Sequence, residues 1–195
     1  MIHFLFSLKR KLKNWLIIRK NRFLRPKIRS ENLKFMQQKI GLGGGCHWCT
    51  EAVFQQINGV TRVEQGYIAS VAAENRLSEA IIVHFYPKIV SLKALIQIHL
   101  NTHKSQSDHS FRTKYRSAIY YFNEDDAAKC EKILSTIQLT SQEPIITQIL
   151  PFNYFEPSRE SIQDYYKKNK NAPFCERYIK PKLLLLQENY ANHLK

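Results

Sequence analysis

Apolar and polar positions alternate with two different periods along the chain, and these periods distinguish strands from helices. Short apolar or alternating runs rich in β-branched and aromatic residues predict strands at 39–44, 61–70, 78–86, 117–122 and 145–150. Apolar residues at helical spacing predict helices at 46–57, 91–99, 123–134 and 159–168. Strands and helices therefore take turns along the chain, which is typical of an α/β or α+β domain whose helices pack on a sheet.

The segment 39–54 joins a strand, a glycine-rich turn and the beginning of a helix. Gly43, Gly44 and Gly45 stand directly before Cys46, and residues without a side chain permit a tight turn. The N-terminus of a helix presents free N–H groups and the positive end of its dipole, which favour negative charge. Because the thiolate is the reactive form of cysteine, this pattern predicts that Cys46 is a nucleophile. The alternative is that Cys46 packs as a small apolar residue.

The charge of the chain is unevenly distributed. The 195 residues carry a formal charge of +14, and residues 1–39 contain 12 Lys and Arg but one acidic residue. We therefore expect a basic N-terminal arm at 1–38 and a nearly neutral domain with a C-terminal tail at 39–195. The arm has no apolar run long enough to span a bilayer and no signal peptide pattern, so we expect a cytoplasmic protein. A solvated arm is the preferred interpretation, and contact with an anionic membrane or nucleic acid is the alternative.

Four cysteines are too few for the disulfide framework of a small secreted domain. Cys46 and Cys49 form a Cys-x-x-Cys pair at the beginning of a helix, a spacing that can close a disulfide or supply half of a metal site. Cys130 and Cys175 are isolated in the sequence, so no second close pair completes a zinc site. We expect redox exchange and no bound metal or cofactor.

Gly45-Cys46-His47-Trp48 resembles the Gly-Cys-Phe-Trp signature of the A-type peptide methionine sulfoxide reductases. Residues 114–120, Lys-Tyr-Arg-Ser-Ala-Ile-Tyr, are very similar to that family's Gln-Tyr-Arg-Ser-x-Ile-Tyr. Weaker similarities follow the family's order at 54–60, 66–67, 78–81, 155 and 163–166. The resemblance covers roughly residues 40–182. It implies an α/β (α+β) two-layer sandwich, ferredoxin-like, with a mixed or antiparallel sheet flanked by helices.

The resemblance also implies a reaction. The Cys46 thiolate would attack the sulfur of methionine S-sulfoxide, free or in proteins, while Glu79 gives a proton to the sulfoxide oxygen. Tyr67 and Tyr115 would hydrogen-bond that oxygen. A carboxyl group that acts as an acid must keep its proton near neutral pH, so we expect Glu79 in an apolar pocket.

The substrate-binding wall is implied to consist of Trp48 and its neighbour His47. His47 stands where the family has Phe, which reduces the apolar wall and adds a titratable ring beside the thiol. The position of the family's Asp falls on Ser110, with Asp108 nearby, and the family's His before Gln is replaced by Ile162. These differences bear on rate and substrate preference.

After the first step Cys46 would be a sulfenic acid, which condenses with a second thiol. Cys175 lies in a segment that resembles a C-terminal Pro-Tyr-Cys of part of the family, and a mobile tail could carry it to Cys46. Cys49 lies one helical turn from Cys46 and needs no tail motion. We rank Cys175 narrowly ahead of Cys49 as the resolving cysteine. Thioredoxin or another small dithiol would then complete turnover.

Two other functions fit parts of the sequence. A general thiol–disulfide oxidoreductase would need the Cys46–Cys49 pair alone, and it would leave Glu79 and the Tyr-Arg-Ser block without a role. A nucleic-acid-binding module would use the net positive charge, although that charge lies mainly in the arm.

Overall fold

The computed structural model describes residues 37–71 and 74–195. Residues Gln38–Lys195 form one compact unit. The predicted basic arm lies outside the described residues, apart from its last two. No helix in the described ranges is long and apolar enough to cross a membrane.

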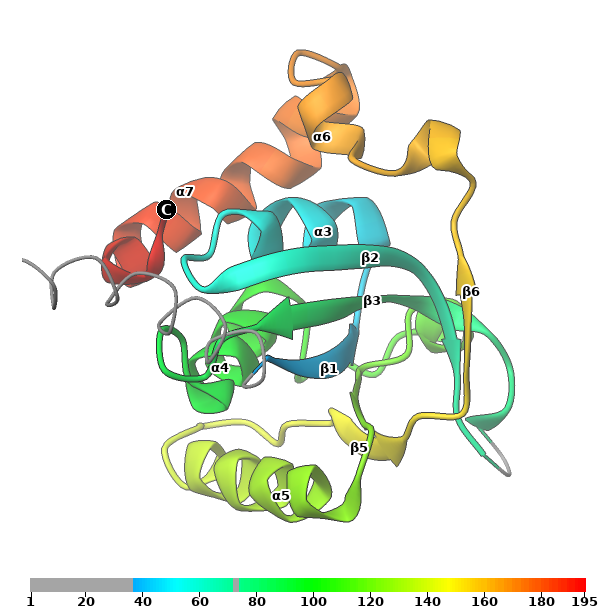
Figure 1. Cartoon of the computed structure of the whole chain (residues 1–195), viewed down its shortest axis with the longest axis vertical. Helices are drawn as coiled ribbons and strands as arrows, with labels where there is room; N and C mark the ends of the chain where they lie inside the picture. Colours follow the sequence, from blue (N-terminus) through cyan, green and yellow to red (C-terminus); the bar gives the residue numbers. More distant parts are fainter. Residues whose placement is uncertain (1–36, 72–73) are drawn as a thin grey trace, which may run out of the picture. The chain divides into compact units, whose positions relative to one another are not determined.

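A curled, mixed sheet runs through this unit (Figure 1). Its six strands are β1 (Gln38–Gly43), β2 (Val60–Ala69), β3 (Ser78–Phe85), β4 (Ala118–Tyr121), β5 (Gln148–Pro151) and β6 (Tyr154–Pro157). Their order across the sheet is β5-β4-β1-β3-β2-β6. All neighbours are antiparallel except β4 and β5, which run parallel.

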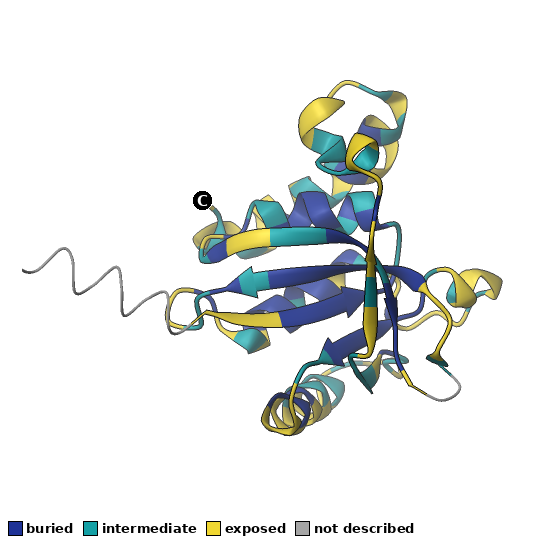
Figure 2. Cartoon of the chain, turned by 45° about the vertical axis from the view of Figure 1, so that its right-hand side comes forward, coloured by how far each residue is buried: buried dark blue, intermediate teal, exposed yellow. Residues whose placement is uncertain are grey.

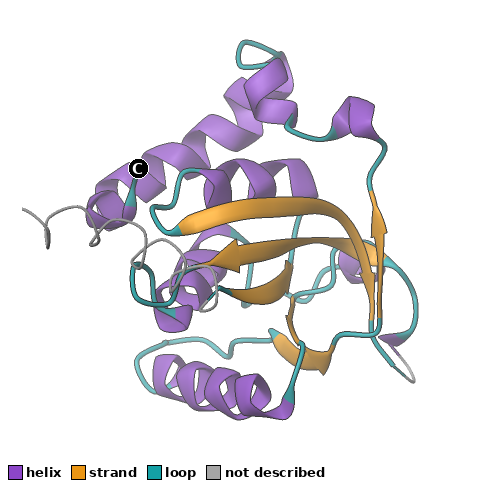
Figure 3. Ribbon diagram, viewed as in Figure 1, coloured by secondary structure: helices purple, strands orange, loops and turns teal. Residues whose placement is uncertain are grey.

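Helices connect and flank these strands (Figure 3). The α-helices of the described residues are α3 (His47–Gln55), α4 (Leu92–Thr102), α5 (Glu124–Gln138), α6 (Tyr165–Lys168) and α7 (Lys180–Tyr190). Short 3-10 turns lie at Ser110–Thr113, Glu160–Ile162 and Ala191–His193, and a π-helical turn at Cys175–Ile179 leads into α7. The N-caps of α4 and α5 are Ser91 and Asn123, whose side chains accept backbone N–H groups.

The main core lies between the sheet and the helices α3 and α4. Ile40 and Leu42 of β1 pack there against apolar residues of both helices, including Phe54 and Leu95, all 1% exposed or less. A smaller cluster on the other sheet face contains Ile68, Ala80, Ile82, Ala118 and Tyr120. The central strands are thus buried, as the dark ribbons of Figure 2 show, because both sheet faces are covered.

The sequence predicted the five strands β1 to β5 and the four helices α3 to α6 in outline. It missed β6 and α7. Leu183 to Leu186 of α7 are consecutive, so they show no helical period, and Pro181 discouraged a helix although proline is tolerated in a first turn. The expected mixed sheet of an α+β fold is confirmed.

Candidate active site

Cys46 is the N-cap of α3, directly after the turn that follows β1. Gly44 in that turn has φ +158°, and a Cβ atom there would lie 2.4 Å from the ring of His103. A residue with a side chain would therefore displace the histidine or the turn. The predicted strand, glycine turn and helix N-terminus are confirmed by this geometry.

The buried His99 and the half-buried His103 support this turn. His99 Nε2 lies 2.9 Å from the carbonyl oxygen of Gly43, and His103 Nδ1 lies 2.6 Å from the carbonyl oxygen of His99. Carbonyl oxygens only accept, so each ring donates there. Burial lowers the pKa of His103 to about 4 and the pKa of His99 well below its usual value. Both rings are thus neutral supports at neutral pH.

The half-buried Cys46 thiol has a lowered pKa. The largest cause is a hydrogen bond from the Cys49 thiol, and the backbone N–H groups of Cys49 and Trp48 add to it. Burial and the negative charge of Glu79 act in the opposite direction. The thiolate is therefore favoured chiefly by the Cys49 thiol, and to a smaller extent by the N–H groups at the N-terminus of α3.

Cys49 is buried and lies next to Cys46. Its Sγ is 3.8 Å from the carbonyl oxygen of Tyr178. The pKa of Cys49 is strongly raised, first by its hydrogen bond to Cys46 and then by burial. Cys175 belongs to the same apolar cluster and is 0% exposed.

The segment that carries Cys175 is helical and packed. It forms the π-helical turn before α7, and α7 contacts both α3 and α4. This differs from the mobile tail that the sequence suggested. Backbone hydrogen bonds also join the end of the chain to the end of α3, where Asn58 N donates to His193 O at 2.7 Å.

Glu79 reaches the helix N-terminus from β3. Its side chain is buried, and its Oε2 accepts the backbone N–H of His47 at 3.1 Å. Lys114 Nζ lies 3.4 Å from the other oxygen, but the lysine side chain is 60% exposed, so this ion pair is weak. Glu79 is close enough to raise the pKa of the Cys46 thiol. The structure thus brings Glu79 and Cys46 together.

His47 is the first residue of α3, and its buried ring lies near the carboxyl group of Glu79. Its Nδ1 is 3.1 Å from the carbonyl oxygen of Gly66 and must donate to it, which leaves Nε2 without a proton in the neutral ring. Nε2 lies 3.8 Å from Glu79 Oε2. Burial lowers the pKa of His47 against the opposing effect of Glu79. The ring of Tyr67 contacts the ring of His47 edge-on, with centroids 5.2 Å apart.

Trp48 belongs to an aromatic group with residues of the C-terminal part. Its ring stacks on Tyr165 at a centroid distance of 4.0 Å and an interplanar angle of 6°. Phe174 contacts Trp48 edge-on, with centroids 5.2 Å apart. The Trp48 ring is thus held by Tyr165 and Phe174.

A mainly apolar pocket of about 690 Å³ opens beside Cys46. Its lining includes Cys49, Tyr115, Phe174 and Lys182. Phe111, 65% exposed, lies at this pocket as well. A thiol at an apolar pocket with phenol groups suits a small, weakly polar group such as a methyl sulfoxide.

The two candidates for the family's Asp lie elsewhere. Asp108 lines a different pocket, together with Arg112 and Arg116. Ser110 is an exposed residue of a 3-10 turn. Neither of them lines the pocket beside Cys46.

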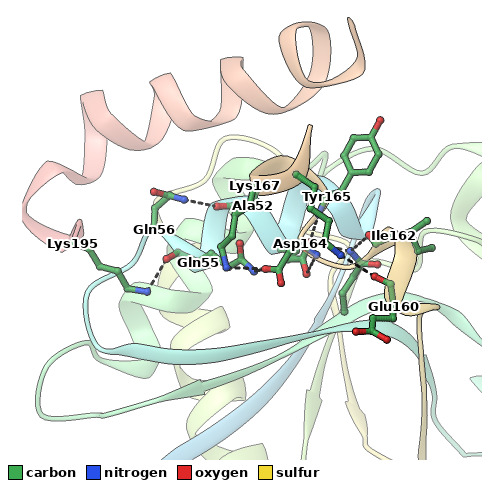
Figure 4. A network of polar contacts seen from close by, with 12 residues as sticks. Ala52, Gln55, Gln56, Glu160, Ile162, Asp164, Tyr165, Lys167 and Lys195 are labelled. Carbon is green, nitrogen blue, oxygen red and sulfur yellow. Dashed lines mark hydrogen bonds and ion pairs between the residues drawn. The ribbon is translucent and has the colours of Figure 1, made fainter. Parts of the chain in front are cut away.

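A buried carboxylate holds the C-terminal part on α3. Glu51 accepts the backbone N–H groups of Asp164 at 3.0 Å and Tyr165 at 3.3 Å. Figure 4 shows this junction, where Gln55 Nε2 also donates to Asp164 Oδ1 at 2.7 Å. Asp164 has φ 54°, an unusual conformation that these bonds stabilise. Glu51 therefore fixes the segment that stacks on Trp48.

The sequence did not reveal the roles of Glu51, Tyr165, Phe174 and Lys182. Glu51 is an ordinary position within the predicted helix, and Lys182 stands directly before the apolar run that begins at Leu183. Neither feature indicates a contact with a segment more than one hundred residues away.

Known proteins are similar to this chain in sequence and in fold. The family model described as peptide methionine sulfoxide reductase matches residues 38–194. Peptide methionine sulfoxide reductase MsrA of Acinetobacter baumannii (strain AYE) is 32% identical over 174 residues, which cover 82% of this chain and 99% of the relative.

Solved structures of methionine sulfoxide reductases and of the yeast protein Mxr1 are similar to this chain in fold. Mxr1 from Saccharomyces cerevisiae in an unusual oxidized form is 25% identical, with a TM-score of 0.58 over 71% of this chain and 86% of that chain. The same yeast protein in complex with Trx2 matches with a TM-score of 0.54 at 23% identity, over 67% of this chain and 85% of that chain. The match of the family model over most of the chain shows that this protein belongs to the peptide methionine sulfoxide reductases, a family of oxidoreductases.

Proposed function

We propose that the protein reduces the S epimer of methionine sulfoxide to methionine, free or within proteins, with Cys46 as the nucleophile. One observation carries the proposal: Cys46 is the N-cap of α3 at an apolar pocket, and the buried carboxyl group of Glu79 accepts the N–H of the next residue, His47. A nucleophile and a proton donor are the two groups that this reduction needs.

In the first step the Cys46 thiolate attacks the sulfoxide sulfur. Glu79 gives a proton to the oxygen as it is transferred, and Tyr67 and Tyr115 hydrogen-bond that oxygen. Cys46 becomes a sulfenic acid and methionine leaves. The support is positional: Tyr115 lines the pocket of Cys46, and Tyr67 contacts His47 beside Glu79.

Trp48 and His47 form the binding wall in this proposal. The Trp48 ring is held by its stack on Tyr165, so it is ordered before substrate arrives. An ordered aromatic surface binds a methyl group at a lower entropic cost than a free side chain does.

The sulfenic acid then condenses with a second thiol of the chain. Cys49 is the first choice on geometry, because it lines the same pocket as Cys46 and the pair spans the first turn of α3. Cys175, ranked first from the sequence, would need to leave a fully buried site. It therefore takes second place as the resolving cysteine, or it accepts the disulfide afterwards.

Thioredoxin is the proposed reductant of the resulting disulfide, with no bound cofactor. A dithiol protein can exchange with a disulfide that lies at an open pocket. Similarity in fold to Mxr1, which has been crystallised with Trx2, is consistent with such a partner.

We also propose a ferredoxin-like core, a cytoplasmic location and contact of the basic arm with anionic surfaces. The connection β1-α3-β2-β3-α4-β4 with strand order β4-β1-β3-β2 supports a ferredoxin-like two-layer core that β5 and β6 extend. The four free thiols support the reducing environment of the cytoplasm. Contact of the basic arm with anionic surfaces rests on its charge alone.

A coupled assay tests the function. NADPH consumption through thioredoxin reductase and thioredoxin is followed with the S and R epimers, for the wild-type protein and for Cys46→Ser. We expect turnover with the S epimer that Cys46→Ser abolishes. The absence of turnover with the S epimer would refute the proposal.

A general thiol–disulfide oxidoreductase is the second candidate, and the hydrogen bond between the Cys46 and Cys49 thiols favours it. Reduction of insulin disulfides without turnover of the sulfoxide would support this alternative.

A further inference from the structure

Formation of the disulfide presents a problem that the first step does not. Cys49 can attack the Cys46 sulfenic acid only as a thiolate. Yet Cys49 is 4% exposed, and burial raises its pKa even after the charge of Cys46 is gone. The site therefore needs a group that favours negative charge on Cys49.

Lys182 is positioned to supply it. The residue lies in the first turn of α7 and lines the same pocket as Cys46 and Cys49. Its Nζ donates to the backbone carbonyl oxygen of Thr102, at the end of α4. The half-buried ammonium group is thus fixed by one bond between two helices, at the pocket that both thiols line.

The other charged groups around the pair do not replace Lys182. Glu79 opposes a thiolate, and burial keeps His103 neutral with a pKa of about 4. Lys104 also lines the pocket but is exposed. Lys182 is the cation that lowers the pKa of Cys49, while both thiols raise the pKa of Lys182 against its burial.

We propose that Lys182 is a positioning residue for the resolving step, where its ammonium group stabilises the Cys49 thiolate that attacks Cys46. This inference rests on the proposed function and on Cys49 as the resolving cysteine. Before substrate reacts, the charge of Lys182 is shared with the Cys46 thiolate. Once Cys46 is a neutral sulfenic acid, Cys49 becomes the anion next to Lys182.

The step balances without another reactant. The Cys49 sulfur forms a bond to the Cys46 sulfur, and the bond between the Cys46 sulfur and its hydroxyl oxygen breaks. Cys49 is oxidised and Cys46 is reduced to the disulfide. The proton lost by Cys49 joins the departing hydroxide, so one water molecule leaves.

A single-turnover experiment separates this step from the first one. Reduced full-length protein is mixed with one equivalent of N-acetyl methionine S-sulfoxide, and acid-quenched samples are taken. Released methionine product reports the first step, disulfide detected by mass spectrometry reports the second, and dimedone traps the sulfenic acid between them.

In Lys182→Met we expect methionine product in full amount, but disulfide formation slower by about tenfold or more, because a rise of one pKa unit lowers the thiolate fraction about tenfold. Dimedone-labelled Cys46 should accumulate. Lys93→Met, which removes an exposed lysine of α4, is the matched control and should behave as the wild type.

Two further variants separate charge from packing. Lys182→Gln keeps a donor for the Thr102 carbonyl but has no charge, and Lys182→Arg keeps both. We expect Lys182→Gln to be slow and its pH–rate profile for disulfide formation to move to higher pH, whereas Lys182→Arg should stay near the wild type. This pair also decides the matter if Lys182→Met fails to fold.

Three results would overturn the proposal. The first is disulfide formation at the wild-type rate in Lys182→Gln. The second is an equal loss in the Gln and Arg variants, which would show a packing role. The third is a slow step in Lys180→Met instead, because Lys180 lowers the pKa of Cys175 and that result would assign the resolving role to Cys175. A wild-type protein that releases no methionine product would instead refute the proposed function.

Discussion

Glu79 has two opposite effects on the proposed reaction of Cys46. The charge of Glu79 raises the pKa of the Cys46 thiol, although the proposed reaction needs Glu79 as an acid. The residue that completes the site therefore makes its nucleophile less available.

Glu79→Gln should change two rates in opposite directions. Alkylation of Cys46 by iodoacetamide at neutral pH should become faster, because the thiol pKa falls when the neighbouring charge is removed. Release of methionine from the sulfoxide should fall by about 10² or more, because the proton donor is lost. Gln can still accept the His47 N–H, so the helix N-terminus should be preserved. A parallel fall of both rates would contradict this assignment.

Cys49→Ala should make Cys46 less acidic. The largest effect that lowers the Cys46 pKa is the hydrogen bond from Cys49, and alanine cannot donate it. The midpoint of the pH dependence of Cys46 alkylation should therefore move upward. Cys49→Ser retains a donor and should show a smaller change. An unchanged midpoint in Cys49→Ala would show that the backbone N–H groups of α3 suffice.

The sequence placed Cys46 correctly at the beginning of a helix because glycine turns and helix starts are local features. The contacts of Glu51 with Asp164 and Tyr165 could not be predicted. They join segments far apart in the chain, and the only local signal is a glutamate at an ordinary helical position. The proximity of Lys182 to Cys49 could not be predicted for the same reason.

At the scale of elements, the end of α4 supports the catalytic turn through its histidines. His99 and His103 are neutral because they are buried. Their hydrogen bonds connect the Gly43 carbonyl oxygen to the helix end. Protonation of either ring would place a positive charge among the groups that support the turn before Cys46.

The free energy of unfolding should consequently decrease as the pH falls. The folded pKa of His103 is about 4, below its usual 6.5, so the unfolded chain binds this proton first as the pH falls. The free energy of unfolding should have its highest value above about pH 6.5, and it should decrease by about 3 kcal/mol as the pH falls to 4. Urea unfolding at several pH values measures it.

The matched variant is His103→Gln, which can donate to the His99 carbonyl but does not titrate. Its free energy of unfolding should decrease less steeply over this range than that of the wild type. His99 contributes to the same slope, so a residual dependence is expected. Equal slopes in both proteins would show that His103 is not the responsible group.

Elements with a clear period were predicted and those without one were missed. The run of β-forming residues in β3 and the acidic first turn in α5 are visible in the sequence. β6 has four residues and is paired only through β2, and α7 has consecutive leucines. Both depend on tertiary packing, which no local pattern reports.

At the scale of the whole molecule, residues 38–195 contain the core and the proposed site. Every residue assigned a role above lies in this compact unit. The net positive charge of the chain is concentrated before it.

A chain that begins at Met36 should therefore melt at the same temperature as the full chain and reduce the sulfoxide with the same kcat/KM. Thermal unfolding and the thioredoxin-coupled assay measure both quantities. The same pair of proteins, compared for binding to anionic vesicles, tests the proposed role of the arm. A marked loss of stability on truncation would show that the compact unit needs the preceding residues.

The stack of Trp48 on Tyr165 has an optical consequence. The chain has two tryptophans, Trp15 and Trp48, so Trp15→Phe leaves one indole, which lies next to the reactive cysteine pair in sequence and space. Its fluorescence should differ between the dithiol and the disulfide, because the two states place different quenching groups beside the ring. The protein thus contains its own reporter, and each turnover can be followed in real time without a dye or a coupled enzyme.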